Sequence, residues 1–105
     1  IFMVNGQATG CFRRIPMAHS YLSNFSFGAT AAPDYLTDID HDLCRALSPI
    51  LKKMGLFFVG LDVIDGKLIE INVTSPTGVP TYNRLYHTAL EETIWNSLLN
   101  ATNME

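Results

Sequence analysis

The chain has 105 residues, of which 48% are hydrophobic and 16% charged, and its formal net charge is −3. This length and composition give at most one small domain with a hydrophobic core, and they exclude a disordered chain. The acidic balance argues against nucleic acid as a partner, and no apolar run approaches the roughly 20 residues that span a membrane. Cys11 and Cys44 have no metal-binding or redox spacing, which favours reduced thiols and a cytoplasmic location.

The chain begins at Ile1 in what already looks like a strand, so we expect a fragment of a longer protein. Residues 1–4, the dipeptide Asn5-Gly6 and residues 8–15 predict a β-hairpin, because Asn-Gly readily adopts the positive φ angles of a tight turn. The second strand carries Arg13 and Arg14. Since neighbouring strand residues face opposite ways, only one of these arginines can point toward a site.

Residues 17–36 have the composition of a loop and show no sustained period. From Thr37 the pattern becomes helical, because apolar residues recur at three- and four-residue spacing as far as Met54. Thr37 is a suitable N-cap and Gly55 a suitable C-cap. We therefore expect one amphipathic helix between these two residues.

Residues 56–73 predict a second β-hairpin, since two apolar-alternating runs meet at Asp65-Gly66. Glu70 and Asn72 interrupt the second run and share one face, about 7 Å apart. Asp62 interrupts the first run. Whether it joins the other two depends on the turn.

A two-residue loop pairs Asp62 with Ile69 and sends it to the opposite face. A three-residue loop with a bulge at Gly66 pairs Asp62 with Leu68 and places it beside Glu70 and Asn72. We favour the three-residue loop because it collects the apolar side chains of both strands on one face. These are Phe57, Val59, Leu61, Val63, Ile69, Ile71 and Val73.

Two carboxylates and one amide backed by an apolar face suit Mg²⁺ or Mn²⁺, which bind one or two carboxylates plus substrate phosphates. The same three residues fit equally well on the solvated face of a half-buried sheet. Residues 74–81 read as a loop, and a final helix is expected over about residues 83–99. The expected fold is therefore α+β, an antiparallel sheet with two helices packed on one face and the other face open to ligand.

The run EINVTSPTG at residues 70–78, preceded by FVGLD at residues 58–62, resembles the C-terminal part of prokaryotic glutathione synthetases, which are ATP-grasp ligases. The Glu-x-Asn element with an upstream Asp is shared by ATP-grasp enzymes, whereas N-V-T-S-P-T-G is particular to glutathione synthetases. The likeness extends from about residue 8 to residue 98 and is weak between residues 17 and 36. It implies that residues 1–105 form the C-terminal subdomain of an ATP-grasp fold, without the N-terminal substrate domain and the first ATP-grasp subdomain.

The resemblance implies roles for individual residues. Asp62, Glu70 and Asn72 would hold one or two Mg²⁺ or Mn²⁺ ions against the phosphates of ATP. Arg14, directly before Ile-Pro, would stabilise charge on the transferred phosphoryl group. Asn72 and Phe58 would contact ATP, with Phe58 near the adenine.

The loop after the metal-side strand would receive the carboxylate of glycine or glutathione through Ser75, Pro76, Thr77 and Gly78. The alternative interpretation is that this loop is an ordinary turn in which the Ser and Thr hydroxyls cap the local backbone. Where the family has a glycine-rich segment with Arg-Gly-Asn, this chain has Leu-Ser-Asn at residues 22–24. Only Asn24 carries over as a substrate contact, and the arginine is missing.

The implied reaction joins γ-glutamylcysteine and glycine. ATP phosphorylates the C-terminal carboxylate of γ-glutamylcysteine, the amine of glycine attacks the acyl phosphate, and glutathione, ADP and phosphate leave. No side-chain nucleophile is needed. Because the lysines and much of the adenine pocket precede the matched part in the family, this chain alone is expected to be inactive.

Two other interpretations stay open. The missing arginine favours a related ATP-grasp ligase with another substrate, and a non-catalytic remnant or interaction domain would keep the hairpin without a nucleotide site. The resemblance further implies small-molecule substrates and is compatible with a homo-oligomer of the full-length protein. The charge and hydropathy of the chain argue against a nucleic-acid or membrane partner.

Overall fold

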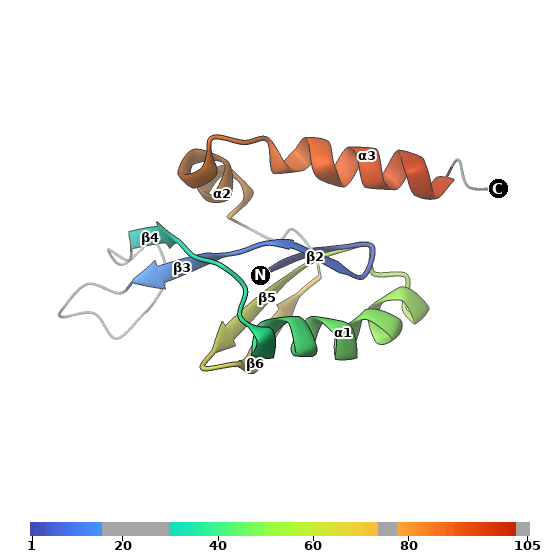
Figure 1. The fold of residues 1–105 in the computed structure, drawn as a ribbon. Helices are drawn as coiled ribbons and strands as arrows, with labels where there is room; N and C mark the ends of the chain where they lie inside the picture. Colours follow the sequence, from blue (N-terminus) through green and yellow to red (C-terminus); the bar gives the residue numbers. More distant parts are fainter. Residues whose placement is uncertain (16–29, 74–77, 103–105) are drawn as a thin grey trace.

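The computed structural model describes residues 1–15, 30–73 and 78–102 (Figure 1). The strands in these ranges are β1 (Phe2–Val4), β2 (Gln7–Gly10), β3 (Phe12–Ile15), β4 (Thr30–Pro33), β5 (Phe58–Ile64) and β6 (Lys67–Asn72). The helices are α1 (Asp38–Lys53), α2 (Val79–Tyr86) and α3 (Leu90–Thr102). None of these helices is long and apolar enough to cross a membrane.

The strands form two sheets, both antiparallel. The larger has the order β2-β1-β5-β6, and the smaller pairs β3 with β4. The turn between β1 and β2 is the expected one, because Asn5 and Gly6 have φ angles of 50° and 77°. The single second strand expected over residues 8–15 is instead divided at Cys11, where the chain leaves the larger sheet.

Strand β4 corrects the prediction of a loop over residues 17–36. Its four residues, Thr30 to Pro33, pair with Ile15 to Phe12 in the reverse order. Alanine and proline have little intrinsic preference for strands, so this segment gives no local signal. The pairing with β3 forms the strand.

Helix α1 has the predicted N-cap, Thr37, but its C-cap is Met54, one residue before the predicted Gly55. The Thr37 side chain accepts a hydrogen bond from the Asp40 N–H at 3.2 Å, and the Asp40 carboxylate accepts one from the Thr37 N–H at 3.0 Å. At the other end Gly55 has a φ of +72° and donates to the Lys52 carbonyl. The cap residues therefore define the helix at both ends.

Helix α1 covers one face of the larger sheet, where the hydrophobic core lies. The buried members of this core are Met3, Cys44, Leu51, Val59 and Leu61. They come from β1, α1 and β5, and Val63, Leu68 and Ile71 pack against them from the hairpin. Burial of these side chains is the main force that joins helix and hairpin.

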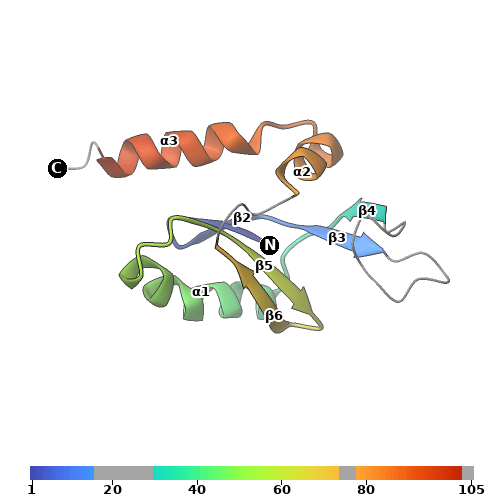
Figure 2. The ribbon, with the colours of Figure 1, turned by 180° about the vertical axis from the view of Figure 1, so that it is seen from behind.

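Helices α2 and α3 lie on the other side of the larger sheet from α1 in both views (Figures 1 and 2). The contact runs through aromatic rings: Tyr82 of α2 meets Phe2 edge-on with 5.6 Å between ring centroids. Phe2 also stacks on Phe58 at 5.9 Å. The α+β class with an antiparallel sheet is confirmed, but the helices are divided between the two faces, so only part of the second face stays open.

The helix expected over residues 83–99 is two helices. His87 ends α2 with a φ of 54°, and the Asn83 side chain accepts a hydrogen bond from the Leu90 N–H at 2.7 Å at the start of α3. Asn83 therefore caps the second helix from within the first. Of the large apolar residues in this segment, Leu90 is buried, whereas Trp95 is exposed on α3, which projects from the rest of the fold (Figure 1).

Candidate functional site

The turn of the β5–β6 hairpin differs from the three-residue loop that we favoured. Asp65 and Gly66 have φ angles of 51° and 74°, and Ile64 pairs with Lys67. This is a two-residue turn with both central residues left-handed. If the pairing at the tip continued regularly along the strands, Asp62 would pair with Ile69 and point to the face opposite Glu70.

A β-bulge restores the arrangement. Val63 pairs with Leu68, but Asp62 pairs with Glu70, so that Ile69 is an extra residue in β6. Asp62 and Glu70 are direct cross-strand neighbours, a position in which Cβ atoms lie about 5 Å apart. The prediction that Asp62 shares a face with Glu70 is confirmed, although a bulge and not the turn brings it about.

The bulge also exchanges two side chains between the faces. Leu68, expected beside Asp62, packs on the hydrophobic core, and Ile69, expected in the core, is 61% exposed. Asn72 pairs with Gly60 and is the next residue on the same face of β6 after Glu70. The open face of the hairpin thus presents two carboxylates and one amide in succession.

These three side chains fit a divalent cation by their donor chemistry. Carboxylate and amide oxygens are hard ligands of the kind that Mg²⁺ and Mn²⁺ prefer. In the part of the chain that the structure describes, no three His, Cys, Asp or Glu side chains gather into a metal site. A cation held by the hairpin would therefore complete its shell from substrate phosphates or water.

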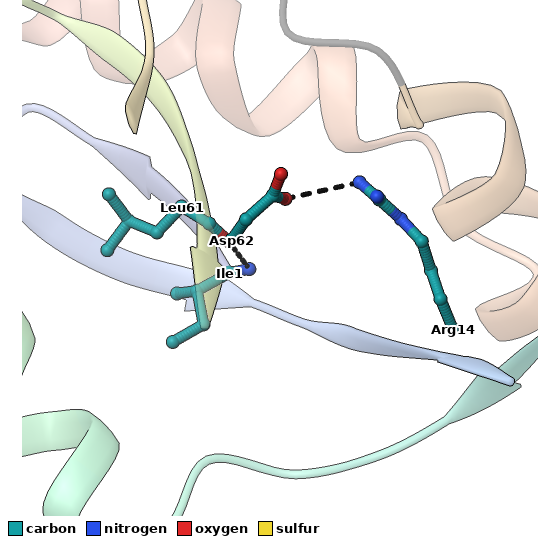
Figure 3. A network of polar contacts seen from close by, with 4 residues as sticks. All are labelled: Ile1, Arg14, Leu61 and Asp62. Carbon is teal, nitrogen blue, oxygen red and sulfur yellow. Dashed lines mark hydrogen bonds and ion pairs between the residues drawn. The ribbon is translucent and has the colours of Figure 1, made fainter. Parts of the chain in front are cut away.

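Arg14 approaches this group from the smaller sheet (Figure 3). Its Nη2 atom lies 3.2 Å from Oδ1 of Asp62, and the two side chains are 33% and 30% exposed. The backbone beside Asp62 is fixed, because Leu61 and Ile1 exchange two hydrogen bonds of 2.7 and 2.9 Å. Of the two adjacent arginines, Arg14 makes this contact, and Arg13 is exposed.

A hollow of about 700 Å³ opens around this ion pair. Its wall is formed by the tip of the hairpin, by β3 and by the segment between β4 and α1. Asp62, Asn72 and Arg14 all line it, whereas Glu70 is exposed beside it. The hollow is large enough for a nucleotide-sized ligand.

Two predicted contacts lie away from this wall. Phe58 is on the face of Asp62 as expected from alternation, but its ring stacks on Phe2 and it does not line the hollow. Gly78 is the N-cap of α2 with a φ of +101°, and a Cβ atom there would lie 3.1 Å from the ring of Phe12. Asn24, Ser75, Pro76 and Thr77 lie outside the described residues, and their roles stay predictions.

No sequence pattern indicated which side chain joins α2 to the smaller sheet. The hydroxyl of Tyr86 lies 2.7 Å from the carbonyl oxygen of Cys11 and 2.8 Å from that of Asp34. In the sequence Tyr86 is one more aromatic residue of an amphipathic helix. Its partners are 52 and 75 positions away along the chain, so no local pattern could reveal them.

Among the residues that the structure describes, neither cysteine has a partner that would activate its thiol. Both thiols are buried, and burial raises the pKa of Cys11 and of Cys44 above the ordinary value of 9.0. A raised pKa lowers the fraction of thiolate, the nucleophilic form. Of the side chains that line the hollow, Asp62, Asn72 and Arg14 are therefore better suited to bind a ligand than the Cys11 thiol.

Comparison with known proteins identifies the class of this protein. The family model described as "Prokaryotic glutathione synthetase, ATP-grasp domain" matches residues 1–87. The α+β fold with its antiparallel sheet is consistent with part of an ATP-grasp domain. The chain belongs to the prokaryotic glutathione synthetase family.

Named relatives agree. A glutathione synthetase of Thermosynechococcus vestitus is 42% identical over 94 residues, which are 90% of this chain and 30% of the relative. One of Synechococcus elongatus is 44% identical over 81% of this chain and 26% of its own length. One of Bradyrhizobium diazoefficiens is 40% identical over 93% of this chain and 31% of its own length. The chain thus spans less than a third of the length of these curated relatives.

Proposed function

We propose that the chain is the C-terminal part of an ATP-dependent carboxylate–amine ligase that joins γ-glutamylcysteine and glycine. The observation that carries this proposal is the pairing of Asp62 with Glu70 across the hairpin, beside Asn72 and within reach of Arg14. The family relationship supports the reaction type. The bulge at Ile69 supports a site as well, because bulges often re-aim side chains next to active sites.

Asp62, Glu70 and Asn72 are the residues that would hold a divalent cation. Bound there, Mg²⁺ or Mn²⁺ would supply positive charge between these oxygens and the phosphates of ATP. The apolar core packs behind β5 and β6, the two strands that carry these residues, and so supports their backbone. Rigid placement of the ligands is what such a site requires of the protein.

Arg14 would act on the substrate phosphates. In the structure its guanidinium is held beside Asp62 by an ion pair whose side chains are about one third exposed. Ion pairs with this degree of exposure contribute only about 0–1 kcal/mol, so an incoming polyphosphate can readily take over the guanidinium. There it would donate hydrogen bonds to the phosphoryl oxygens during transfer to the carboxylate of γ-glutamylcysteine.

The remaining step is formation of the amide. Phosphate is a far better leaving group than the oxide that a free carboxylate would have to lose, so the amine of glycine displaces phosphate from the acyl phosphate, loses a proton to solvent and forms glutathione. Residues 75–78 are proposed to receive the carboxylate of glycine. No side-chain nucleophile takes part, which agrees with two buried thiols of raised pKa.

The substitution Glu70→Gln tests the metal role in the intact protein. It removes one negative charge from the open face and leaves the size of the side chain unchanged. We expect ADP release that depends on γ-glutamylcysteine to fall about 100-fold or more, and the Mg²⁺ concentration for half-maximal rate to rise.

The matched control is Glu92→Gln on the exposed surface of α3, which makes the same change of charge away from the hollow. It should leave both quantities unchanged. Normal ADP release by Glu70→Gln would overturn the metal assignment. Release that depends on an amine other than glycine would instead favour a related ligase.

A further inference from the structure

The hydroxyl of Tyr86 holds the end of the smaller sheet at which Phe12 pairs with Pro33. It lies 2.7 Å from the carbonyl oxygen of Cys11, and it accepts a hydrogen bond from the Asp34 N–H at 2.8 Å. Its single proton is shared between the Cys11 carbonyl and that of Asp34, which is also 2.8 Å away. Cys11 directly precedes β3, and Asp34 directly follows β4. One oxygen atom therefore fastens the place where the chain enters this sheet and the place where it leaves.

The smaller sheet needs such a connection. No ladder of backbone hydrogen bonds joins β3 or β4 to the larger sheet in the described residues. Arg14 lies on β3, three residues beyond Cys11, and Asp62 lies on β5 of the larger sheet. The 3.2 Å contact between them therefore crosses from one sheet to the other, and its geometry depends on how the sheets are joined.

Tyr86 is itself anchored on the larger sheet. Its ring lies 4.6 Å from that of Tyr82, which meets Phe2 edge-on at 5.6 Å. Phe2 belongs to β1 and pairs with Gly60, two residues before Asp62. A continuous path of ring contacts and strand pairing thus connects the hydroxyl of Tyr86 to the strand that carries Asp62.

We propose that Tyr86 is a positioning residue, which fixes the smaller sheet so that Arg14 reaches the phosphoryl group that a divalent cation would hold at Asp62 and Glu70. The inference rests on the proposed function in one respect, the action of Arg14 on that phosphoryl group. Tyr86 contacts neither substrate nor the reacting atoms in this assignment. It acts by placing β3.

The substitution Tyr86→Phe tests the proposal in the intact protein. It removes the hydroxyl and keeps the ring that packs on Tyr82. We expect kcat to fall about tenfold with little change in KM for ATP, because a misplaced arginine weakens contacts made in the transition state. The matched control is Tyr82→Phe, which removes a hydroxyl for which the described residues provide no hydrogen-bond partner, and it should keep the normal kcat.

A double-mutant cycle separates positioning from a general loss of stability. If Tyr86 acts through Arg14, Tyr86→Phe should lower kcat in the wild-type background and have no further effect beside Arg14→Ala. An equal loss in both backgrounds would overturn the proposal. The proposal would also be overturned if Tyr86→Phe had a normal kcat while Arg14→Ala had a low one. A normal kcat for Arg14→Ala would instead overturn the proposed role of Arg14 itself.

Hydrogen exchange provides a readout that does not depend on activity. The Asp34 N–H donates to the Tyr86 hydroxyl, so its exchange should become faster in Tyr86→Phe and stay unchanged in Tyr82→Phe. Unchanged exchange of the Asp34 N–H in Tyr86→Phe would show that the hydroxyl does not hold the residue that follows β4.

Discussion

Among single residues, Gly10 has a role that depends on space and not on backbone angle. Tyr82 lies directly over it: a Cβ atom at residue 10 would be 2.3 Å from the tyrosine oxygen and 2.7 Å from two ring carbons. The aromatic contact between α2 and the larger sheet therefore requires glycine at the end of β2. Gly55 is the opposite case, because its φ is +72° and nothing lies within 4 Å of the added Cβ.

We expect Gly10→Ala to destabilise the protein by about 2 kcal/mol or more, since the ring of Tyr82 and the helix that carries it must move. Gly55→Ala is the control, and it should cost only about 1 kcal/mol, the strain of a left-handed alanine. Urea unfolding of the intact protein measures both values. A larger cost for Gly55→Ala would contradict the packing of α2 on the sheet.

Of the secondary-structure elements, the bulged strand β6 determines the site. Because the bulge adds one residue, Ile69, to a regular two-residue hairpin, removing that residue leaves Asp62 opposite Glu70. A deletion elsewhere in the strand instead transfers one polar side chain to the core face, since strand side chains alternate.

We therefore expect deletion of Ile69 to preserve the fold and the placement of Glu70 and Asn72. Deletion of Ile71, two residues further on, should bury Glu70 or Asn72 against Leu61 and cost at least about 1–3 kcal/mol for the unsatisfied polar group. Thermal unfolding compares the two variants. Equal destabilisation by both deletions would contradict the bulged register.

At the scale of the whole molecule, the two thiols are buried in different places. Cys44 belongs to the core under α1, whereas Cys11 lies at the junction of the two sheets, and they are 4% and 9% exposed. Burial raises the pKa of both above 9.0 in the folded protein. The unfolded chain has no such burial, so its thiols ionise at lower pH.

Stability is therefore expected to fall as the pH rises. Below the unfolded pKa both states are protonated and the thiols do not affect folding. Above it the unfolded state loses protons first, which favours unfolding until the pH passes the folded pKa. Melting temperatures between pH 7.5 and 9.5 (conditions chosen below the raised pKa of Tyr82) should decrease more steeply in the wild type than in a Cys11→Ala/Cys44→Ala variant. Equal slopes would contradict the burial of the thiols.

The sequence by itself determined the local features of this protein. Thr37, Gly55 and the turn dipeptides Asn5-Gly6 and Asp65-Gly66 set the ends of α1 and the two hairpins, because caps and tight turns depend on neighbouring residues only. The run at residues 70–78 indicated the family. Alternation and binary pattern also placed Asp62 on the face of Glu70, although the bulge that achieves this had no signal of its own.

Only the tertiary structure decided what depends on distant partners. Strand β4 exists because β3 pairs with it, α2 lies on the face opposite α1 because Tyr82 packs on Phe2, and the two sheets are joined through Tyr86. Each of these contacts forms between residues far apart in the sequence, where neither periodicity nor capping gives information. The physical reason is that long-range packing selects among several local structures that are nearly equal in free energy.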